Sequence, residues 1–234
     1  MVNKLWVVVA AAGSGSRFSS QRAKQFFPLA GVTVAEVTLQ RLLAMPFVAG
    51  VVVVRDLADR HWSQLSLLDD PRVVSVGGGA SRALSVQAGL QALAAQLQPE
   101  DWVLVHDIAR PCVRTADIAK LIDEVADHPV GGLLASPVVE TLKRVADGAV
   151  AATCPRQHYA LAQTPQLFRF GLLQRAMAQA LAGGVEITDE ASALEAQGLA
   201  VKVVNGRADN IKITYAEQLA QAQAILTAQQ QETL

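Results

Sequence analysis

The sequence predicts an α/β fold with a mostly parallel, twisted sheet and helices on both of its faces. Of the 234 residues, 51% are hydrophobic and only 5% are aromatic, a composition that suits helices rich in Ala, Val and Leu packed on a buried sheet. Apolar runs recur along the chain with helical segments between them, and this alternation is typical of parallel sheets. The first run, residues 5–10, does not alternate with polar residues, which indicates a strand buried on both faces.

The first half of the chain repeats this alternation of strand and helix. Apolar residues at helical spacing cover residues 33–45, and Pro46 ends that helix. Three glycines at 77–79 separate a strand from a long helix, and Thr115 is the expected N-cap of the next helix. The predicted strands are 5–10, 50–54, 72–76 and 102–105, and the predicted helices are 33–45, 81–97 and 115–126.

The second half departs from the pattern after a strand at residues 132–136. Residues 138–159 are mixed in character, with Asp147-Gly148 as a turn signal, and predict an extended hairpin. Because a lone hairpin is marginally stable in water, we expect this arm to pack on a second subunit. Helices 170–182, 188–197 and 215–229 and a strand at 200–204 complete the chain. Without a linker or repeat, residues 1–234 are expected to form one domain carrying the 138–159 arm.

Charge and cysteine content exclude several classes of protein. The chain has 20 Lys and Arg against 21 Asp and Glu, so it lacks the basic surface of a nucleic-acid binder. Cys112 and Cys154 are too few for a disulfide framework and predict free thiols in a reducing compartment. The apolar start is too short for export or for crossing a membrane, so we expect a cytoplasmic protein.

The turn after the first strand predicts a polyphosphate site. Small residues and glycines, including Gly13 and Gly15, follow the apolar run, and the cations Arg17 and Lys24 come directly after them. Phe18 stands where the dinucleotide fingerprint needs its third glycine, and the Gly-Lys-Ser/Thr of a P-loop is missing. An ordinary glycine-rich turn would explain the glycines but not two cations beside them. Backbone N–H groups and cations together favour a triphosphate.

The end of the fourth predicted strand adds charged candidates. Asp107 follows the strand directly, where open α/β sheets bind ligands, so it is a candidate for contact with Mg²⁺ or a ribose. Arg110 is a phosphate candidate. His106 is interpreted as a buried histidine whose hydrogen bonds are satisfied within the protein.

Three later motifs have ordinary interpretations when taken singly. Gly78-Gly79 opens a helix with Ser81 as N-cap, and Arg82 could be a solvated charge. Residues 188–190, Thr-Asp-Glu, are typical of a helix start whose acids complement the dipole. Lys212 lies between two isoleucines, so it either points into a cleft or extends past them to solvent.

Together these motifs resemble the 2-C-methyl-D-erythritol 4-phosphate cytidylyltransferase family, and they occur in the family's order across nearly the whole chain. The motifs that carry the resemblance are Ala11-Ala12-Gly13-x-Gly15-x-Arg17, Lys24-Gln25, Gly78-Gly79-x-x-Arg82-x-x-Ser85-Val86, Val105-His106-Asp107-x-Ala109-Arg110-Pro111, Thr164-Pro165-Gln166, Thr188-Asp189-Glu190-Ala191 and Gly206-Arg207-x-Asp209-Asn210-Ile211-Lys212. The resemblance implies a Rossmann-like nucleotidyltransferase fold, dependence on Mg²⁺ and a homodimer clasped by the arms. It also implies that CTP and methylerythritol 4-phosphate react to give the CDP-alcohol and pyrophosphate.

The resemblance also implies roles for individual residues. Arg17 and Lys24 match catalytic residues that stabilise charge at the α-phosphate, and Arg156 and Lys212 match residues that position the sugar phosphate. The other acceptor-side matches are Asp107, Thr164, and the pair Thr141 and Arg110, which in the family reach the acceptor from the partner subunit. The matches at the cytidine are Ala11, Ala12, Gly13, Gly15, Gly79, Arg82 and Ser85. Asp107 is also the match nearest the metal, which the CTP phosphates mainly hold.

Three other functions compete with this expectation. A cytidylyltransferase for another polyol phosphate, such as ribitol 5-phosphate, would share the nucleotide half. A nucleotide-binding regulator without catalysis is disfavoured because Arg17, Lys24, Asp107 and Lys212 are all present. A dinucleotide-dependent oxidoreductase is disfavoured by Phe18.

Overall fold

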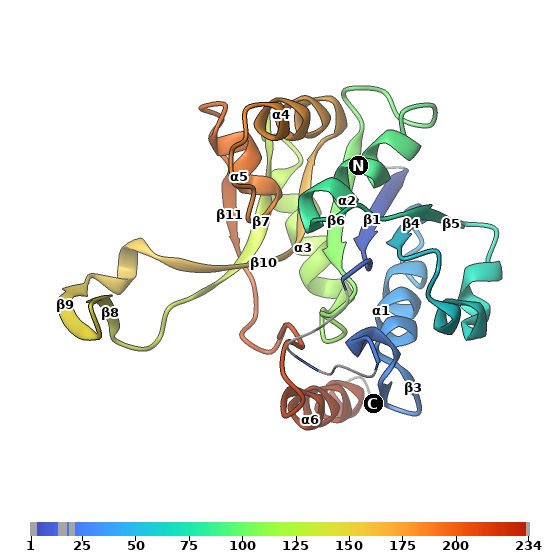
Figure 1. The fold of residues 1–234 in the computed structure, drawn as a ribbon, viewed down its shortest axis with the longest axis horizontal. Helices are drawn as coiled ribbons and strands as arrows, with labels where there is room; N and C mark the ends of the chain where they lie inside the picture. Colours follow the sequence, from blue (N-terminus) through green and yellow to red (C-terminus); the bar gives the residue numbers. More distant parts are fainter. Residues whose placement is uncertain (1–3, 14–17, 19–21, 233–234) are drawn as a thin grey trace.

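One seven-stranded mixed sheet organises the chain, as the computed structural model shows for residues 4–13, 18 and 22–232 (Figure 1). From edge to edge the strands are β11 (Lys202–Asn205), β7 (Gly131–Pro137), β10 (Ala160–Arg169), β6 (Trp102–Asp107), β1 (Leu5–Ala10), β4 (Val48–Arg55) and β5 (Val73–Gly77). Neighbours run parallel except at β10, which is antiparallel to both β7 and β6. The prediction of a mostly parallel sheet is therefore confirmed.

The helices and the short hairpins complete the described fold. The α-helices are α1 (Val34–Leu43), α2 (Arg82–Ala92), α3 (Thr115–Val125), α4 (Phe170–Ala182), α5 (Glu190–Glu195) and α6 (Gln218–Gln231). The 3₁₀ helices are η1 (Lys24–Phe26), η2 (Arg60–Gln64), η3 (Ser66–Asp69) and η4 (Arg156–His158). The hairpins are β2 (Pro28–Leu29) with β3 (Val32–Thr33), and β8 (Leu142–Ala146) with β9 (Ala149–Cys154). Among the described residues no helix is long and apolar enough to cross a membrane.

The core lies on both faces of the sheet, because successive residues of each strand point to opposite sides. Val7 packs in the cluster under α1 and α3, whereas Val8 packs in the cluster under α2, α4 and α5. A third cluster lies beyond the sheet, where Leu226 of α6 packs with Val34 of α1 and with Ile213. This third cluster holds the segment that leads out of the loop carrying Lys212.

The fold differs from the predictions in several details. The sequence does not predict the ten-residue strand β10, because Gln163, Thr164 and Gln166 interrupt its apolar character; all three are buried. The helix predicted over residues 81–97 ends earlier, at the close of α2. Thr115 is the first residue of α3 rather than its cap, and no side chain caps that helix.

The predicted hairpin is confirmed as an arm formed by β8 and β9. Asp147 and Gly148 form its turn with φ values of 50° and 77°, a conformation that suits a two-residue turn between strands. Figure 1 shows the arm reaching away from the body at the ends of β7 and β10. Its Val139, Val145 and Val150 are exposed in this single chain.

Candidate active site

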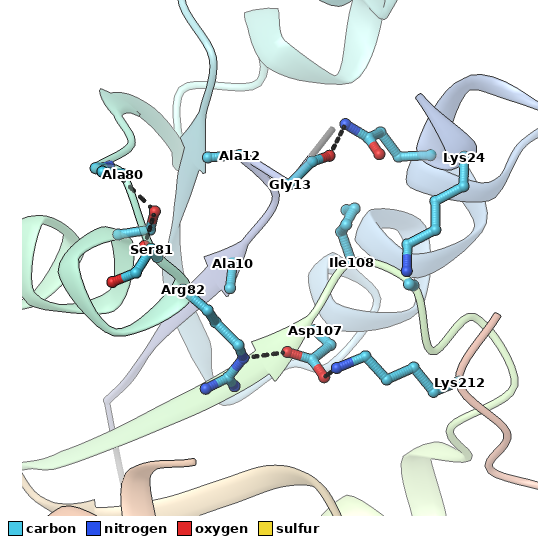
Figure 2. A pocket seen from close by; sticks show the side chains of 14 residues that line it. Ala10, Ala12, Gly13, Lys24, Ala80, Ser81, Arg82, Asp107, Ile108 and Lys212 are labelled. Carbon is cyan, nitrogen blue, oxygen red and sulfur yellow. Dashed lines mark hydrogen bonds and ion pairs between the residues drawn. The ribbon is translucent and has the colours of Figure 1, made fainter. Parts of the chain in front are cut away.

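A cavity of about 370 Å³ opens at the carboxyl ends of β1 and β6 (Figure 2), the edge at which parallel sheets bind ligands. It is lined by Ala10, Ala12, Gly13, Lys24, Gln25, Gly79, Ala80, Ser81, Arg82, Ser85, Asp107, Ile108, Ala109 and Lys212. Among these described lining residues there are three cations and one carboxylate. The cavity therefore favours an anionic ligand.

The turn after β1 forms one wall of this cavity. Ala12 and Gly13 line it, while Ala11 is buried directly behind them. The side-chain amide of Gln25 donates to the carbonyl oxygen of Ala11 at 3.2 Å, which ties the turn to η1. Lys24, the first residue of η1, lines the cavity opposite Asp107, as Figure 2 shows. The predicted site residues Gly15 and Arg17 lie outside the described residues.

The second glycine loop forms the facing wall. Gly78 allows the two loops to approach closely, since a Cβ there would lie 2.2 Å from the Cβ of Ala12. The backbone N–H of Gly79 donates to the Ser85 hydroxyl at 3.1 Å, and that hydroxyl donates to the carbonyl oxygen of Ser81 at 2.9 Å. Ser81 is the N-cap of α2, as predicted. Five of the residues expected at the nucleotide therefore line one cavity: Ala12, Gly13, Gly79, Arg82 and Ser85.

Asp107 is the charged centre at which the elements of the site meet. Its Oδ1 accepts from Nε of Arg82 at 2.9 Å, and its Oδ2 accepts from Nζ of Lys212 at 2.7 Å. Burial alone would raise the pKa of Asp107, but the charges of Arg82 and Lys212 hold it well below its usual range. Asp107 is therefore ionised at neutral pH, and Lys212 points into the cleft rather than past its apolar neighbours (Figure 2).

Arg82 is a half-buried, paired member of this network, not a solvated charge. Its guanidinium donates to both carboxylate oxygens of Glu190, at 2.7 and 3.1 Å, and Glu190 is fully buried. Burial opposes the charge of Arg82, yet Glu190 and Asp107 raise its pKa above the usual value. Both acids also lie where the predicted helix start needs them, Asp189 as the N-cap of α5 and Glu190 in its first turn. The Arg82–Glu190 pair was not predicted, since no local pattern signals it.

A second cavity, of about 210 Å³, adjoins the first. Its described lining comprises Arg82, Asp107, Arg110, Ala162, Gln163, Thr164, Gln166, Thr188, Asp189 and Lys212. Arg82, Asp107 and Lys212 line both cavities, so two anionic ligands could be held side by side with this charged cluster between them.

Arg110 and Thr164 lie in this second cavity within their own chain. The Nε of Arg110 is 4.0 Å from Oδ2 of Asp107, and its Nη1 donates to the carbonyl oxygen of Asn210 at 2.6 Å. Arg110 thus lines a cavity of its own chain, and its expected reach to a partner's acceptor stays a prediction. The Thr164 hydroxyl accepts from the backbone N–H of Asp107 at 3.0 Å. His106 is buried and hydrogen-bonded, as predicted.

The two arm residues expected at the acceptor lie elsewhere in the single chain. Thr141 and Arg156 are both exposed, and neither lines either cavity. A guanidinium nitrogen of Arg156 donates to the carbonyl oxygen of Val139, so it stiffens the base of the arm.

The described residues offer no metal cage of their own. No group of three or more His, Cys, Asp or Glu side chains could hold an ion among them. Asp107 is the one carboxylate lining the first cavity in the described part of the chain. An ionised carboxylate has about four acceptor positions, so Asp107 can accept from Arg82 and Lys212 and still contact an ion. This fits Mg²⁺ carried by phosphate oxygens with one protein carboxylate nearby.

Comparison with known proteins agrees with this geometry. The family model described as 2-C-methyl-D-erythritol 4-phosphate cytidylyltransferase matches residues 5–228. A protein of that name from Ectopseudomonas mendocina is 51% identical over 222 residues, covering 94% of each chain. Its counterpart from Pseudomonas aeruginosa PAO1 is 50% identical over 220 residues, covering 93% of this chain and 94% of its own.

Solved structures of proteins with the same name share the fold. The crystal structure from Francisella tularensis is 32% identical with a TM-score of 0.80, covering 95% of this chain and 99% of that one. The structure from Thermus thermophilus is 31% identical with a TM-score of 0.74, covering 94% of this chain and 97% of that one.

Proposed function

This chain belongs to the 2-C-methyl-D-erythritol 4-phosphate cytidylyltransferase family, and we propose that its two adjoining cavities are the active site, the first for CTP and the second for the sugar phosphate. The observation that carries this assignment is the shared cluster of Arg82, Asp107 and Lys212, which lines both cavities. Two phosphate-bearing substrates must meet in this reaction, and the cluster lies where they would meet.

The enzyme transfers the cytidylyl group of CTP to 2-C-methyl-D-erythritol 4-phosphate. An oxygen of the acceptor phosphate forms a bond to the α-phosphorus of CTP, and the bond from that phosphorus to the bridging oxygen of the β-phosphate breaks. Pyrophosphate leaves with the electron pair. The attacking oxygen is already anionic, so the step needs no strong general base; it needs two anions held together and growing charge stabilised.

Lys24 supplies positive charge on the nucleotide side of this step. It extends from η1 into the first cavity, across from Ala80 and Ser81 of the second glycine loop (Figure 2). We assign it to the α-phosphoryl oxygens, together with Arg17 from the same turn. Ala11, Ala12, Gly13 and Gly15 of that turn, with Gly79, Arg82 and Ser85 of the second loop, hold the cytidine and its ribose in this proposal.

Mg²⁺ completes the nucleotide site in this proposal. The triphosphate brings the ion, and Asp107 is the carboxylate that would contact it. When bound, the ion neutralises charge on the phosphates and on the departing pyrophosphate.

Lys212 and Arg110 bind the acceptor phosphate in the second cavity. Both are cationic, and the buried carboxylate of Asp107 holds Lys212 in place at 2.7 Å. Asp107 thereby keeps the ammonium oriented before the substrate arrives, and a preorganised charge needs no reorganisation when the substrate reacts.

The arm supports a homodimer that completes the acceptor site. Figure 1 shows that it reaches away from its own body, and its exposed valines have no cover in the single chain. In this proposal the arm embraces a second copy and brings Thr141 and Arg156 to that copy's acceptor. Light scattering at micromolar concentration should give the mass of two chains, and deletion of residues 139–157 should give one. A monomeric intact protein would contradict the proposal.

A cytoplasmic location is part of the same proposal and is supported by the cysteines. Cys112 is buried and Cys154 half-buried, and both are free thiols, as befits a reducing compartment.

Pyrophosphate release from CTP tests the function. We expect release with 2-C-methyl-D-erythritol 4-phosphate in the presence of Mg²⁺, and none without acceptor. Ribitol 5-phosphate, run in parallel at the same concentration, tests the acceptor. Turnover with ribitol 5-phosphate alone would overturn the acceptor assignment, and binding of CTP without any release would indicate a non-catalytic protein.

A further inference from the structure

A closed ring of four hydrogen bonds lies beneath the second cavity. The imidazole of His106 bonds through Nε2 to the carbonyl oxygen of Arg110 at 3.2 Å, and Nη1 of Arg110 donates to the carbonyl oxygen of Asn210 at 2.6 Å. The Asn210 amide donates to the carbonyl oxygen of Thr164 at 2.9 Å. The Thr164 hydroxyl lies 3.1 Å from Nδ1 of His106, which closes the ring.

The directions of these bonds follow from the groups themselves. A carbonyl oxygen only accepts, so Nε2 of His106 carries a hydrogen and donates to Arg110. The Thr164 hydroxyl accepts from the backbone N–H of Asp107, and its own hydrogen points at Nδ1. Burial lowers the pKa of His106 to about 4, which agrees with a neutral imidazole whose Nδ1 accepts a hydrogen bond. The hydroxyl of Thr164 is thus engaged on both sides within the protein.

The ring joins three separate parts of the chain that carry the acceptor-side charges. His106 immediately precedes Asp107 at the end of β6, and Arg110 lies in the turn that follows. Asn210 lies two residues before Lys212 and is buried. Thr164 belongs to β10, the strand between β6 and β7. A change in the ring would therefore displace Asp107, Arg110 and Lys212 relative to one another.

We propose that His106 and Asn210 are positioning residues for the acceptor phosphate, acting through this ring to set the spacing of Arg110 and Lys212. The inference rests on the proposed function, because it takes the second cavity as the acceptor site. It reassigns Thr164, which acts through His106 and the backbone of Asp107 rather than by donating its hydroxyl to the substrate. The nucleotide cavity shares Asp107 and Lys212 with the second cavity, but no member of the ring lines it.

Kinetics of two single variants and their double variant test this role. His106→Phe removes the hydrogen bonds of the imidazole to Arg110 and to Thr164, and Asn210→Ala removes the hydrogen bond from the Asn210 amide to Thr164. Each removes at least one buried hydrogen bond and should therefore raise KM for the sugar phosphate by about tenfold, while KM for CTP stays within about twofold. Because both act through one ring, the double variant should raise KM by much less than the product of the single effects.

Two further variants separate positioning from general loss of stability. Val105→Ala removes buried volume from the same strand without touching the ring, so it should lower the unfolding temperature and leave both KM values unchanged. His106→Gln keeps an amide donor that can reach the Arg110 carbonyl, so its KM should lie between wild type and His106→Phe. If His106→Phe does not fold, His106→Gln still tests the role of His106.

The outcomes distinguish the ring from the function on which it rests. Wild-type protein that releases no pyrophosphate with this acceptor refutes the proposed function itself. If the wild type is active, two results would refute the positioning role alone. One is that the His106 and Asn210 variants raise KM for both substrates equally, and the other is that the double variant raises KM by the product of the single effects. A selective and non-additive rise in KM for the acceptor supports it.

Discussion

Replacing Lys212 with alanine should separate acceptor binding from nucleotide binding. The ammonium lies 2.7 Å from Asp107 and lines both cavities, so its loss removes a charged contact to the acceptor phosphate. A hydrogen bond to a charged group contributes about 1.5–3 kcal/mol, which corresponds to a fall of about 10- to 150-fold in kcat/KM for the sugar phosphate. KM for CTP should stay within about twofold.

The stability of the protein should change little in the same variant. The Lys212 side chain is 39% exposed, so solvent screens its pair with Asp107, and Arg82 still neutralises the carboxylate. A loss of at most about 1 kcal/mol would lower the unfolding temperature by about 2–4 °C.

Steady-state pyrophosphate release, with each substrate varied in turn, measures both KM values for the Lys212→Ala variant. Lys120→Ala removes an exposed lysine on α3 that lines neither cavity, and it should behave as wild type. Unchanged kinetics for Lys212→Ala, or an effect confined to CTP, would refute the placement of the acceptor phosphate.

Three further perturbations test other parts of the site. Lys24→Ala should lower kcat by roughly 10²- to 10³-fold with little change in KM for CTP, and wild-type turnover at saturating substrate would contradict its role at the α-phosphate. Glu190→Leu leaves the half-buried Arg82 with one acidic partner and should cost about 3 kcal/mol by thermal unfolding; equal loss in Glu195→Gln, an exposed control on the same helix, would argue against a stabilising pair. The free energy of unfolding should fall as pH drops from about 6.5 to about 4, because His106 binds a proton below about pH 6.5 in the unfolded chain but only below about pH 4 when its imidazole is buried. His106→Phe should make this fall shallower, and an identical pH profile would count against a neutral imidazole.

The sequence predicted those parts of the fold that depend on local pattern. Apolar runs identified the parallel strands, and Asp147-Gly148 identified the turn of the arm, because both signals lie within a few residues. Strand β10 could not be predicted in this way, because Thr164 and its polar neighbours are buried beside the candidate site and break the apolar pattern typical of a core strand. Burial of polar side chains cannot be seen in a sequence before the fold is known.

The candidate site divides in the same way. Asp107 could be predicted, since a carboxylate at the end of a buried strand reaches the ligand edge of the sheet. The role of its partner Arg82 could not be predicted, because the carboxylate that pairs with the guanidinium belongs to Glu190, 108 positions further along the chain. The hydrogen-bonded ring of His106 and Asn210 likewise joins residues that only the folded sheet brings together. Roles for Arg17 and Gly15 came from the family resemblance, and both remain predictions.

A crystal structure with CTP, Mg²⁺ and the sugar phosphate would show whether the two cavities hold the two substrates side by side. We expect cytidine between the two glycine loops near Gly79, the triphosphate beside Lys24, and the acceptor phosphate against Lys212 and Arg110. The attacking oxygen should then lie about 3–3.5 Å from the α-phosphorus, as a reactive arrangement requires. A sugar phosphate bound away from Lys212, or a nucleotide outside the first cavity, would contradict it.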